Sequence, residues 1–337
     1  MSVAIRRYEV PCRPPFWARG GHAQTLLGHL LPSPGKRIVR GRDIGEREVR
    51  IPDGDRLVVY ELSGTSGVRV HLFHGLSGDV NSEYMRRTAA VLGARGHEVW
   101  AANHRGCGTG RGLAARPYHS GRTEDLQAVL AASRRDAPDR LHLLIGFSLG
   151  GNAALLLAAQ QLDPLPDGIV AVNPPVDLER SSVDIGRGLC RVYEMRFMWR
   201  LRRAVAERAR LGLSSKRYDI SLQTSLIDFD DMFTAPECGF ESGRDYYRRC
   251  SSLPRLADVR TPSVIVTAAD DPFVDPAAYR DAEPSADVFL HVEPTGGHVG
   301  YVTRGGLVWR RWLDGALAHY VDELVRLRRS RQESAQE

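Results

Sequence analysis

One pentapeptide, Gly146-Phe147-Ser148-Leu149-Gly150, constrains this chain more than any other part of its sequence. An apolar run with the length of a buried strand precedes it at 141–145, and a strongly helix-forming run follows at 154–159. Between a strand and a helix, the pattern G-x-S-x-G is typical of a nucleophile elbow, a sharp turn that exposes a serine hydroxyl. The glycines suit such a turn, because a Cβ at their positions would collide with neighbouring backbone. The pentapeptide therefore predicts that Ser148 is a nucleophile.

Short apolar runs of strand length alternate with helical segments along most of the chain. Together with the elbow, this alternation predicts the α/β-hydrolase fold, a mostly parallel central sheet flanked by helices. A turn at 52–55 separates the first two runs and predicts an antiparallel hairpin. The expected strands are 49–51, 57–62, 68–73, 97–102, 141–147, 169–173, 263–268 and 288–292. The expected core helices include 84–94, 124–134 and a closing helix over 306–327.

Composition divides the chain into a core and further segments. Residues 1–45, rich in Pro, Gly and Arg, are expected to form an N-terminal arm that wraps on the domain. The α/β-hydrolase core comprises 46–176 and 247–329, and the polar end at 330–337 is expected to be a disordered tail. Residues 177–246 contain no convincing strand and follow the strand after the elbow helix, so we expect a helical lid there, over the active site.

Arginine gathers on the segment 185–211 of the expected lid. Such a face suits a peripheral membrane contact with anionic lipid, but an ordinary solvated helix face is the simpler interpretation. The arginines concerned are Arg187, Arg191, Arg196, Arg200 and Arg203.

Composition and charge limit the partners of the chain. It is 42% apolar and 26% charged, as globular proteins are, and its net charge of +5 is spread among interspersed Asp and Glu. No nucleic-acid-binding motif accompanies the charge, so we expect no nucleic-acid partner. No apolar stretch reaches the ~18 residues that span a bilayer, and the first residues lack the apolar core of a secretion signal. Five widely spaced cysteines without a C-x-x-C pair predict reduced thiols in a cytoplasmic protein and no metal site.

A serine nucleophile needs a base, and the base needs a third group that fixes its tautomer. In α/β-hydrolases these groups follow in the order serine, acid, histidine. The expected strand 263–268 leads to Asp270 and Asp271. Asp271 is the expected acid, Asp270 is the alternative, and capping of the following helix is a non-catalytic role open to both. His298 is the expected base, because it follows the strand 288–292 in a glycine-flanked loop that lets an imidazole reach over the nucleophile.

The oxyanion of a tetrahedral intermediate needs two preorganised N–H donors. The backbone N–H of Leu149, directly after the nucleophile, is the first candidate. The second is the backbone N–H of Leu76, in the loop 74–78 that follows an earlier strand. This chemistry requires neither a metal nor a cofactor, and we expect none.

Motifs distributed over nearly the whole chain match a known family. They are 20–25 (GGHAQT), 74–78 (HGLSG), 81–84 (NSEY), 104–108 (HRGCG), 118–121 (YHSG), 123–125 (TED), 146–152 (GFSLGGN), 229–231 (FDD), 246–247 (YY), 270–273 (DDPF) and 296–300 (GGHVG). On these motifs the chain resembles the YheT-type α/β-hydrolases, which are related to the animal abhydrolase-domain lipases and the plant embryogenesis-associated hydrolases.

The resemblance implies that Ser148, Asp271 and His298 form the charge-relay set and that carboxylic esters are hydrolysed. Some relatives act on phospholipids or acylglycerols. The animal relatives carry an N-terminal membrane anchor that this sequence does not show, so the bacterial branch is the expected one. The motifs at 20–25 and 104–108 indicate no chemistry by themselves, and loop shaping by glycine is the interpretation we favour.

These observations predict a serine esterase that acts on a small-molecule or lipid acyl ester through an acyl-enzyme. A lipase or phospholipase that works at a membrane with the same triad is one alternative. An idle binding protein on a hydrolase scaffold is another, against which the intact triad argues. The sequence indicates neither the acyl and alcohol groups nor the oligomeric state.

Overall fold

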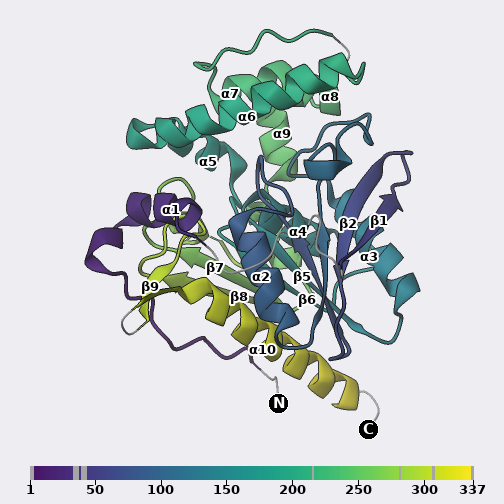
Figure 1. The fold of residues 1–337 in the computed structure, drawn as a ribbon, viewed down its shortest axis with the longest axis vertical. Helices are drawn as coiled ribbons and strands as arrows, with labels where there is room; N and C mark the ends of the chain where they lie inside the picture. Colours follow the sequence, from purple (N-terminus) through teal and green to yellow (C-terminus); the bar gives the residue numbers. More distant parts are fainter. Residues whose placement is uncertain are drawn as a thin grey trace.

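A large β-sheet forms the centre of the molecule. The computed structural model describes residues 4–32, 38, 44–214, 216–280, 282–305 and 308–334. An eight-stranded sheet has the order β1-β2-β4-β3-β5-β6-β7-β8, in which β1 and β2 run antiparallel to their neighbours and the other pairs are parallel (Figure 1). The predicted α/β fold with a mostly parallel sheet, including its antiparallel hairpin, is therefore confirmed. Its strands are β1 (Ile44–Arg50), β2 (Arg56–Leu62), β3 (Val68–Phe73), β4 (Glu98–Ala102), β5 (Leu141–Phe147), β6 (Gly168–Val172), β7 (Ser263–Ala268) and β8 (Val288–Glu293).

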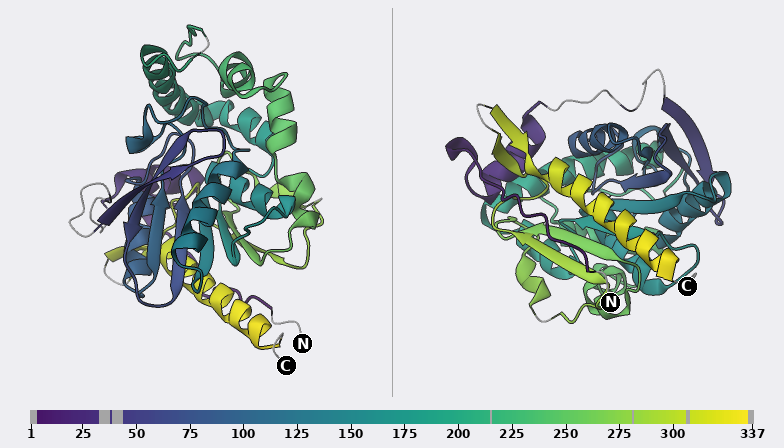
Figure 2. Two further views of the ribbon diagram at one scale, coloured as in Figure 1. Left: turned by 90° about the vertical axis from the view of Figure 1, so that its right-hand side faces the viewer. Right: turned by 90° about the horizontal axis from the view of Figure 1, so that it is seen from below.

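Alternating side chains of the buried strands build one core on each face of the sheet. In β3, Val70 and Leu72 belong to one core and Phe73 to the other, as the two-residue period of a strand requires. Helices α2 (Glu83–Gly93) and α10 (Trp312–Ser334) cover the first face. Helices α3 (Thr123–Asp136) and α4 (Leu149–Gln160) cover the second, so that the sheet is enclosed between two helical layers (Figure 2).

A helical segment separates β6 from β7. Among the described residues from 178 to 250 there is no strand, and the helices lie together at one end of the sheet (Figure 1). They are α5 (Leu178–Ile185), α6 (Arg191–Arg210), α7 (Leu226–Phe229), a π-helical turn (Asp230–Thr234), α8 (Ala235–Cys238) and α9 (Gly243–Cys250). The predicted boundary between 246 and 247 falls inside α9. The segment has one small apolar core of its own and shares a second with Phe273 and Val274, which follow β7. The Arg200 side chain donates to the carbonyl of Ser77, 2.9 Å away in the loop after β3.

The chain after β8 differs from the expectation. A second, two-stranded sheet is formed by β9 (Val302–Gly305) and β10 (Val308–Arg311), and the closing helix α10 begins only at Trp312. The predicted start at 306 is therefore wrong. The helix also continues to Ser334, so residues 330–334 are helical rather than disordered; Arg328 and Arg331 anchor these last turns to Asp167 and Asp287. Residues 306–307 and 335–337 lie outside the described part.

The residues predicted as an arm contain a helix that the sequence did not suggest. Helix α1 (Gly21–Leu30) lies beside β9 (Figure 1). Before it, the backbone N–H of Cys12 donates to Glu293 (2.7 Å), and Arg6 pairs with Glu323 of α10. The described arm residues therefore follow the β8–β9–α10 part of the core. Short 3-10 helices complete the fold: η1 (Phe16–Ala18), η2 (Gly108–Gly110), η3 (Gly188–Cys190), η5 (Leu253–Asp258) and η6 (Pro276–Tyr279).

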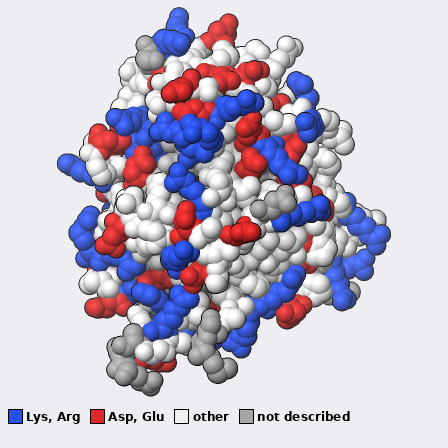
Figure 3. All heavy atoms as spheres, turned by 180° about the vertical axis from the view of Figure 1, so that it is seen from behind, with Lys and Arg blue, Asp and Glu red and all other residues white. Residues whose placement is uncertain are grey.

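The surface charge is mixed. On the face drawn in Figure 3, Lys and Arg side chains alternate with Asp and Glu rather than forming one basic field. Within the described ranges, none of the helices has the length and apolar character needed to cross a membrane.

Candidate active site

Ser148 occupies a strained turn between β5 and α4. Its φ of 51° and ψ of −120° are rare for a residue with a side chain, and its N–H donates to Val172 O at 2.8 Å. A Cβ on Gly146 would collide with the carbonyl of Gly150, and one on Gly150 would lie 2.7 Å from the carbonyl of His74. The glycines of the pentapeptide are thus required by close backbone contact, as the sequence predicts.

Three of the predicted site residues lie in one hydrogen-bonded chain. His298 Nε2 is 3.0 Å from Ser148 Oγ, and His298 Nδ1 is 2.8 Å from Asp271 Oδ2. Because a carboxylate only accepts, the geometry assigns the proton to Nδ1 and leaves the Nε2 lone pair facing the serine hydroxyl. Asp271 and His298 are buried, so little water competes for these bonds. This is the arrangement that activates a serine for nucleophilic attack.

Asp270 and Asp271 are adjacent but hold different partners. Asp271 Oδ1 accepts from the backbone N–H groups of Phe273 and Val274, while its Oδ2 faces His298. Asp270 does not face the imidazole. Its Oδ1 accepts from the N–H groups of both Gly296 and Gly297 at 2.8 Å, and its Oδ2 accepts from Thr295. Asp270 therefore ties down the loop that carries the histidine.

Asn173 joins Asp271 to the loop that carries His298, and sequence reasoning missed it. It has a left-handed backbone conformation, φ 44°, directly after β6. Its amide Nδ2 donates to Asp271 Oδ2 at 2.7 Å and to Gly297 O at 3.2 Å, and its Oδ1 accepts from Tyr301 OH at 3.0 Å. The position of a polar residue at the carboxyl end of a parallel strand was the available signal.

The loop after β3 approaches Ser148 through a glycine. A Cβ on Gly75 would lie 2.9 Å from the Cβ of Ser148. The N–H of Gly75 donates to Tyr84 OH at 3.0 Å, which fixes the backbone directly before Leu76. The second predicted donor, the N–H of Leu149, belongs to the first residue of α4, where the helix dipole favours negative charge. The oxyanion roles of Leu76 and Leu149 stay predictions.

Buried histidines shape this loop. His74 Nε2 accepts from the backbone N–H of His104 at 3.2 Å, and its Nδ1 lies 2.8 Å from Gly75 O, which it reaches as a donor. Burial lowers the pKa of His74 to about 4, so the ring is neutral and this pattern of one donor and one acceptor is maintained. The motif at 104–108 thus supports the loop 74–78.

A second serine–histidine pair lies elsewhere and has a structural role. Ser133 Oγ is 3.0 Å from His142 Nδ1, and it also accepts from Arg69 at 2.9 Å. Ser133 is in the last turns of α3 and His142 near the start of β5, at the end of the sheet opposite Ser148. Both side chains are fully buried, which excludes contact with a substrate.

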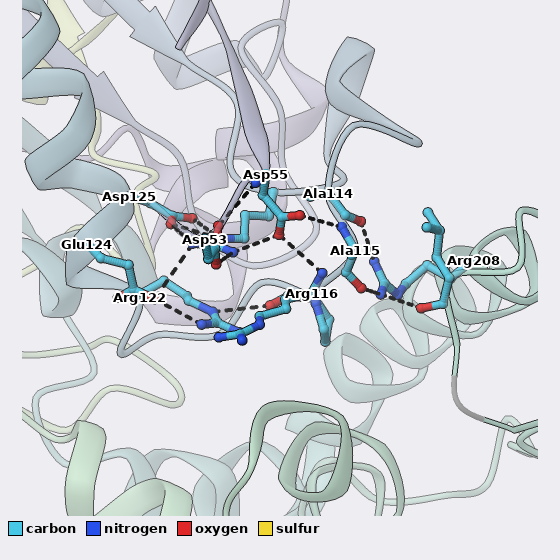
Figure 4. A network of polar contacts seen from close by, with 12 residues as sticks. Asp53, Asp55, Ala114, Ala115, Arg116, Arg122, Glu124, Asp125 and Arg208 are labelled. Atoms are coloured by element: carbon cyan, nitrogen blue, oxygen red, sulfur yellow. Dashed lines mark hydrogen bonds and ion pairs between the residues drawn. The ribbon is translucent and has the colours of Figure 1, made fainter. Parts of the chain in front are cut away.

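A buried polar network that includes Asp55, Asp125 and Arg208 connects the core to α6 (Figure 4). Arg105 is at its centre. Its guanidinium binds Asp125 at 2.7 and 2.8 Å through Nε and Asp55 at 2.7 Å through Nη1. Asp55 in turn accepts from the N–H of Ala115 at 2.7 Å, and Arg208 of α6 donates to the carbonyls of Ala114 and Ala115. The carboxyl end of α6 is therefore fixed to the core.

Neither a metal centre nor a reactive cysteine is apparent in the described residues. They contain no group of three or more His, Cys, Asp or Glu side chains that could hold a metal. All five cysteines are free, and burial raises the pKa of Cys107 to about 12, which leaves its thiol protonated and poorly nucleophilic.

Comparisons with known proteins agree on one family. The family described as serine aminopeptidase S33 matches residues 66–299. The chain is 31% identical over 311 residues to the YheT protein of Escherichia coli, provisionally named an esterase, with 89% of each chain covered. It is 27% identical to the monoacylglycerol lipase of Saccharomyces cerevisiae, over 74% of this chain and 58% of the lipase. The solved structure of the Pyrococcus furiosus esterase Pf2001 has a TM-score of 0.53 at 16% identity, covering 80% of this chain and 88% of that one, and so shares the fold.

Proposed function

This chain belongs to the S33 serine aminopeptidase family of α/β-hydrolases, and we propose that it is a serine hydrolase that cleaves carboxylic esters through an acyl-enzyme. The observation that carries the proposal is the chain of hydrogen bonds from Ser148 Oγ through His298 to Asp271. The names of the relatives support an ester as the substrate class, since YheT is named an esterase and the yeast relative a monoacylglycerol lipase.

In the proposed reaction, His298 Nε2 takes the proton of Ser148 as its Oγ attacks the ester carbonyl. Asp271 holds the imidazole in the tautomer that can do this and stabilises the imidazolium that forms. The N–H groups of Leu76 and Leu149 receive the oxyanion, and His298 then protonates the leaving alcohol. Water attacks the acyl-enzyme with His298 again as the base, and Ser148 is regenerated.

The proposal is tested by labelling the purified protein with a fluorophosphonate and by measuring the hydrolysis of nitrophenyl esters. Ser148→Ala should abolish labelling and lower ester hydrolysis by on the order of 10³-fold or more, because the nucleophile is lost. Ser133→Ala is the matched control, since it also removes a histidine-bonded hydroxyl, and it should keep labelling. A well-folded wild type that is not labelled would contradict the proposal and favour an idle binding protein.

A second candidate is a lipase that takes its acyl ester from a membrane, and one surface feature favours it. Helix α6 exposes Val192, Met195 and Trp199 by 64%, 53% and 49%, which is unusual for apolar side chains three and four residues apart. Arginines flank this stripe, and the Arg203 guanidinium lies 4.8 Å from the centre of the Trp199 ring. An apolar stripe edged by arginine matches a surface of anionic lipid.

The α5–α9 segment would serve as the lid of the proposed enzyme. It shares a contact with the loop 74–78 through Arg200 and Ser77, next to a predicted oxyanion donor. We also propose a cytoplasmic location, as the cysteine pattern predicts, and a small-molecule or lipid ester as the substrate.

A further inference from the structure

The loop that carries His298 has an unfavourable backbone. Gly297, Val299 and Tyr301 have φ values of 54°, 61° and 48°, in the left-handed region. For a β-branched valine and a bulky tyrosine this conformation is costly, and it persists only where the surrounding structure imposes it. Something outside the loop must therefore hold these residues.

Helix α1 supplies a direct contact to the histidine itself. The hydroxyl of Thr25 accepts from the backbone N–H of His298 at 2.9 Å and donates to Gly21 O at 2.7 Å. Thr25 is buried, and its hydroxyl is thus fixed by one bond on each side. The contact links residues that are 273 positions apart in the chain.

The backbones of α1 and the loop also touch. A Cβ on Gly28 would lie 2.7 Å from the Cα of Gly300, and one on Gly300 would collide with the carbonyl of Gln24. The fully buried Gln24 side chain accepts from Val302 N at 2.6 Å and donates to Val302 O at 3.0 Å, as a neighbouring strand would. The loop is thus held directly at His298 and again on its carboxyl side.

We propose that α1 of the N-terminal arm is a positioning element for the active site, and that Thr25 is the residue through which it fixes His298. The inference rests on the proposed function, in which His298 is the base. Helix α1 lies before residues 66–299, which match the S33 family, and the motif at 20–25 indicated no chemistry in the sequence. The motif at 20–25 thereby acquires a purpose beyond loop shaping.

The first test removes the Thr25 hydroxyl without changing the size of the side chain. Thr25→Val should lower kcat for a short nitrophenyl ester by about tenfold or more and leave KM within about twofold, because it displaces the base and not the substrate. Thr25→Ser retains the hydroxyl and should restore most of kcat. Thr303→Val is the matched control, because Thr303 Oγ1 also joins arm and core, accepting from Arg13 N at 2.9 Å, but away from His298.

The second test displaces α1 from the same loop by steric overlap. Gly28→Ala should also lower kcat with KM unchanged, because its Cβ meets Gly300. Gly93→Ala, at the end of α2, has no atom within 4 Å of the added Cβ and should have no effect. If Thr25→Val does not fold, as judged by circular dichroism, the comparison of Gly28→Ala with Gly93→Ala tests whether α1 positions the loop that carries His298.

Hydrogen exchange separates this inference from the proposed function. Residues 296–301 should exchange about tenfold faster in Thr25→Val than in wild type or Thr303→Val, whether or not the protein hydrolyses esters. Unchanged exchange in this segment would overturn the inference. So would a kcat loss in Thr25→Val no larger than that in Thr303→Val, since the arm would then act only through general stability.

Discussion

The neighbouring carboxylates Asp270 and Asp271 lie in different environments, and their hydrogen-bond partners indicate what each does. Asp271 accepts a hydrogen bond from the imidazole of His298. Asp270 accepts hydrogen bonds from Thr295 and from two backbone amides of the loop that carries His298. One can influence the protonation of the imidazole directly, and the other only through the position of the loop.

We therefore predict that the same Asp→Asn substitution lowers kcat far more at position 271 than at position 270. Asp271→Asn should lower kcat by on the order of 10⁴-fold, because a carboxamide favours the wrong imidazole tautomer. Asp270→Asn should lower kcat by about tenfold or less, because the remaining oxygen can still accept from Gly296 and Gly297 while the NH₂ group donates to the Thr295 hydroxyl. The measurement is kcat for a nitrophenyl ester, with the midpoint of thermal unfolding as the control for folding. The reverse order of the two effects would make Asp270 the acid.

Residues could be predicted from the sequence where a local pattern reflects their environment. Ser148 and His298 lie in loops whose glycines are visible in the sequence, and the order of the acid and the base follows from the fold class. Asn173 could not be found in this way, because it looks like the last residue of a strand. Its contacts to Asp271 and Tyr301 join parts of the chain about a hundred residues apart.

Among the elements, buried strands and apolar helices were predictable, while α1 was not. The buried face of α1 consists of Gln24, Thr25 and Gly28, so it has no apolar repeat of helical period. Such a helix is held by hydrogen bonds and close backbone contact with the β9 region, neither of which a local pattern reveals. The β9–β10 hairpin was missed for a similar reason, since its short strands include arginine and glycine.

The helical segment contains a buried carboxylate whose ionisation should affect its stability. Asp230, in the π-helical turn, accepts from Thr234 at 2.6 Å and from Tyr247 of α9 at 2.7 Å. Burial raises the pKa of Asp230 to about 6, against the lowering effect of these two hydrogen bonds. The folded state therefore holds a proton here at a pH where the unfolded chain has released it. This contribution to stability is complete below the unfolded pKa of about 3.9 and is lost progressively as the pH rises from there to about 6.

We predict that the free energy of unfolding of wild type, relative to Asp230→Asn, falls by roughly 1 kcal/mol between pH 5 and pH 7.5. The asparagine stays neutral and keeps one acceptor and one donor for the two hydroxyls, so it lacks the pH-dependent term. Urea unfolding at both pH values measures the difference. Asp231→Asn, at an exposed neighbouring carboxylate, is the control and should not reproduce it. A constant difference across this range would show that Asp230 remains ionised when buried.

At the scale of the whole molecule, α1 contacts both the histidine loop and the helical segment over the sheet. His22 of α1 stacks on Tyr193 of α6, with ring centres 5.8 Å apart and planes within 4°, and its Nδ1 is 3.2 Å from Tyr193 OH. At its other end α6 is fixed through Arg208 to the network around Arg105 (Figure 4). Helix α6 is thus held at both ends, and its outward side, with Val192, Met195 and Trp199, is what it can present to a partner.

If that outward side docks on lipid, binding should depend on both its apolar and its basic side chains. We predict that the protein cosediments with vesicles containing anionic lipid better than with zwitterionic vesicles, and that added salt weakens binding because it screens the arginines. Replacing Met195 and Trp199 together by serine should reduce binding by about tenfold or more, since two large apolar side chains no longer enter the interface. Leu162→Ser is the control, because Leu162 is as exposed, at 51%, but lies beyond the end of α4. The same double variant should lose activity toward long-chain esters in vesicles and keep it toward short soluble esters, because Ser148 and His298 are untouched. No binding to either kind of vesicle would make α6 a solvated face and leave an esterase of soluble substrates, and equal binding to both would contradict the role of the arginines.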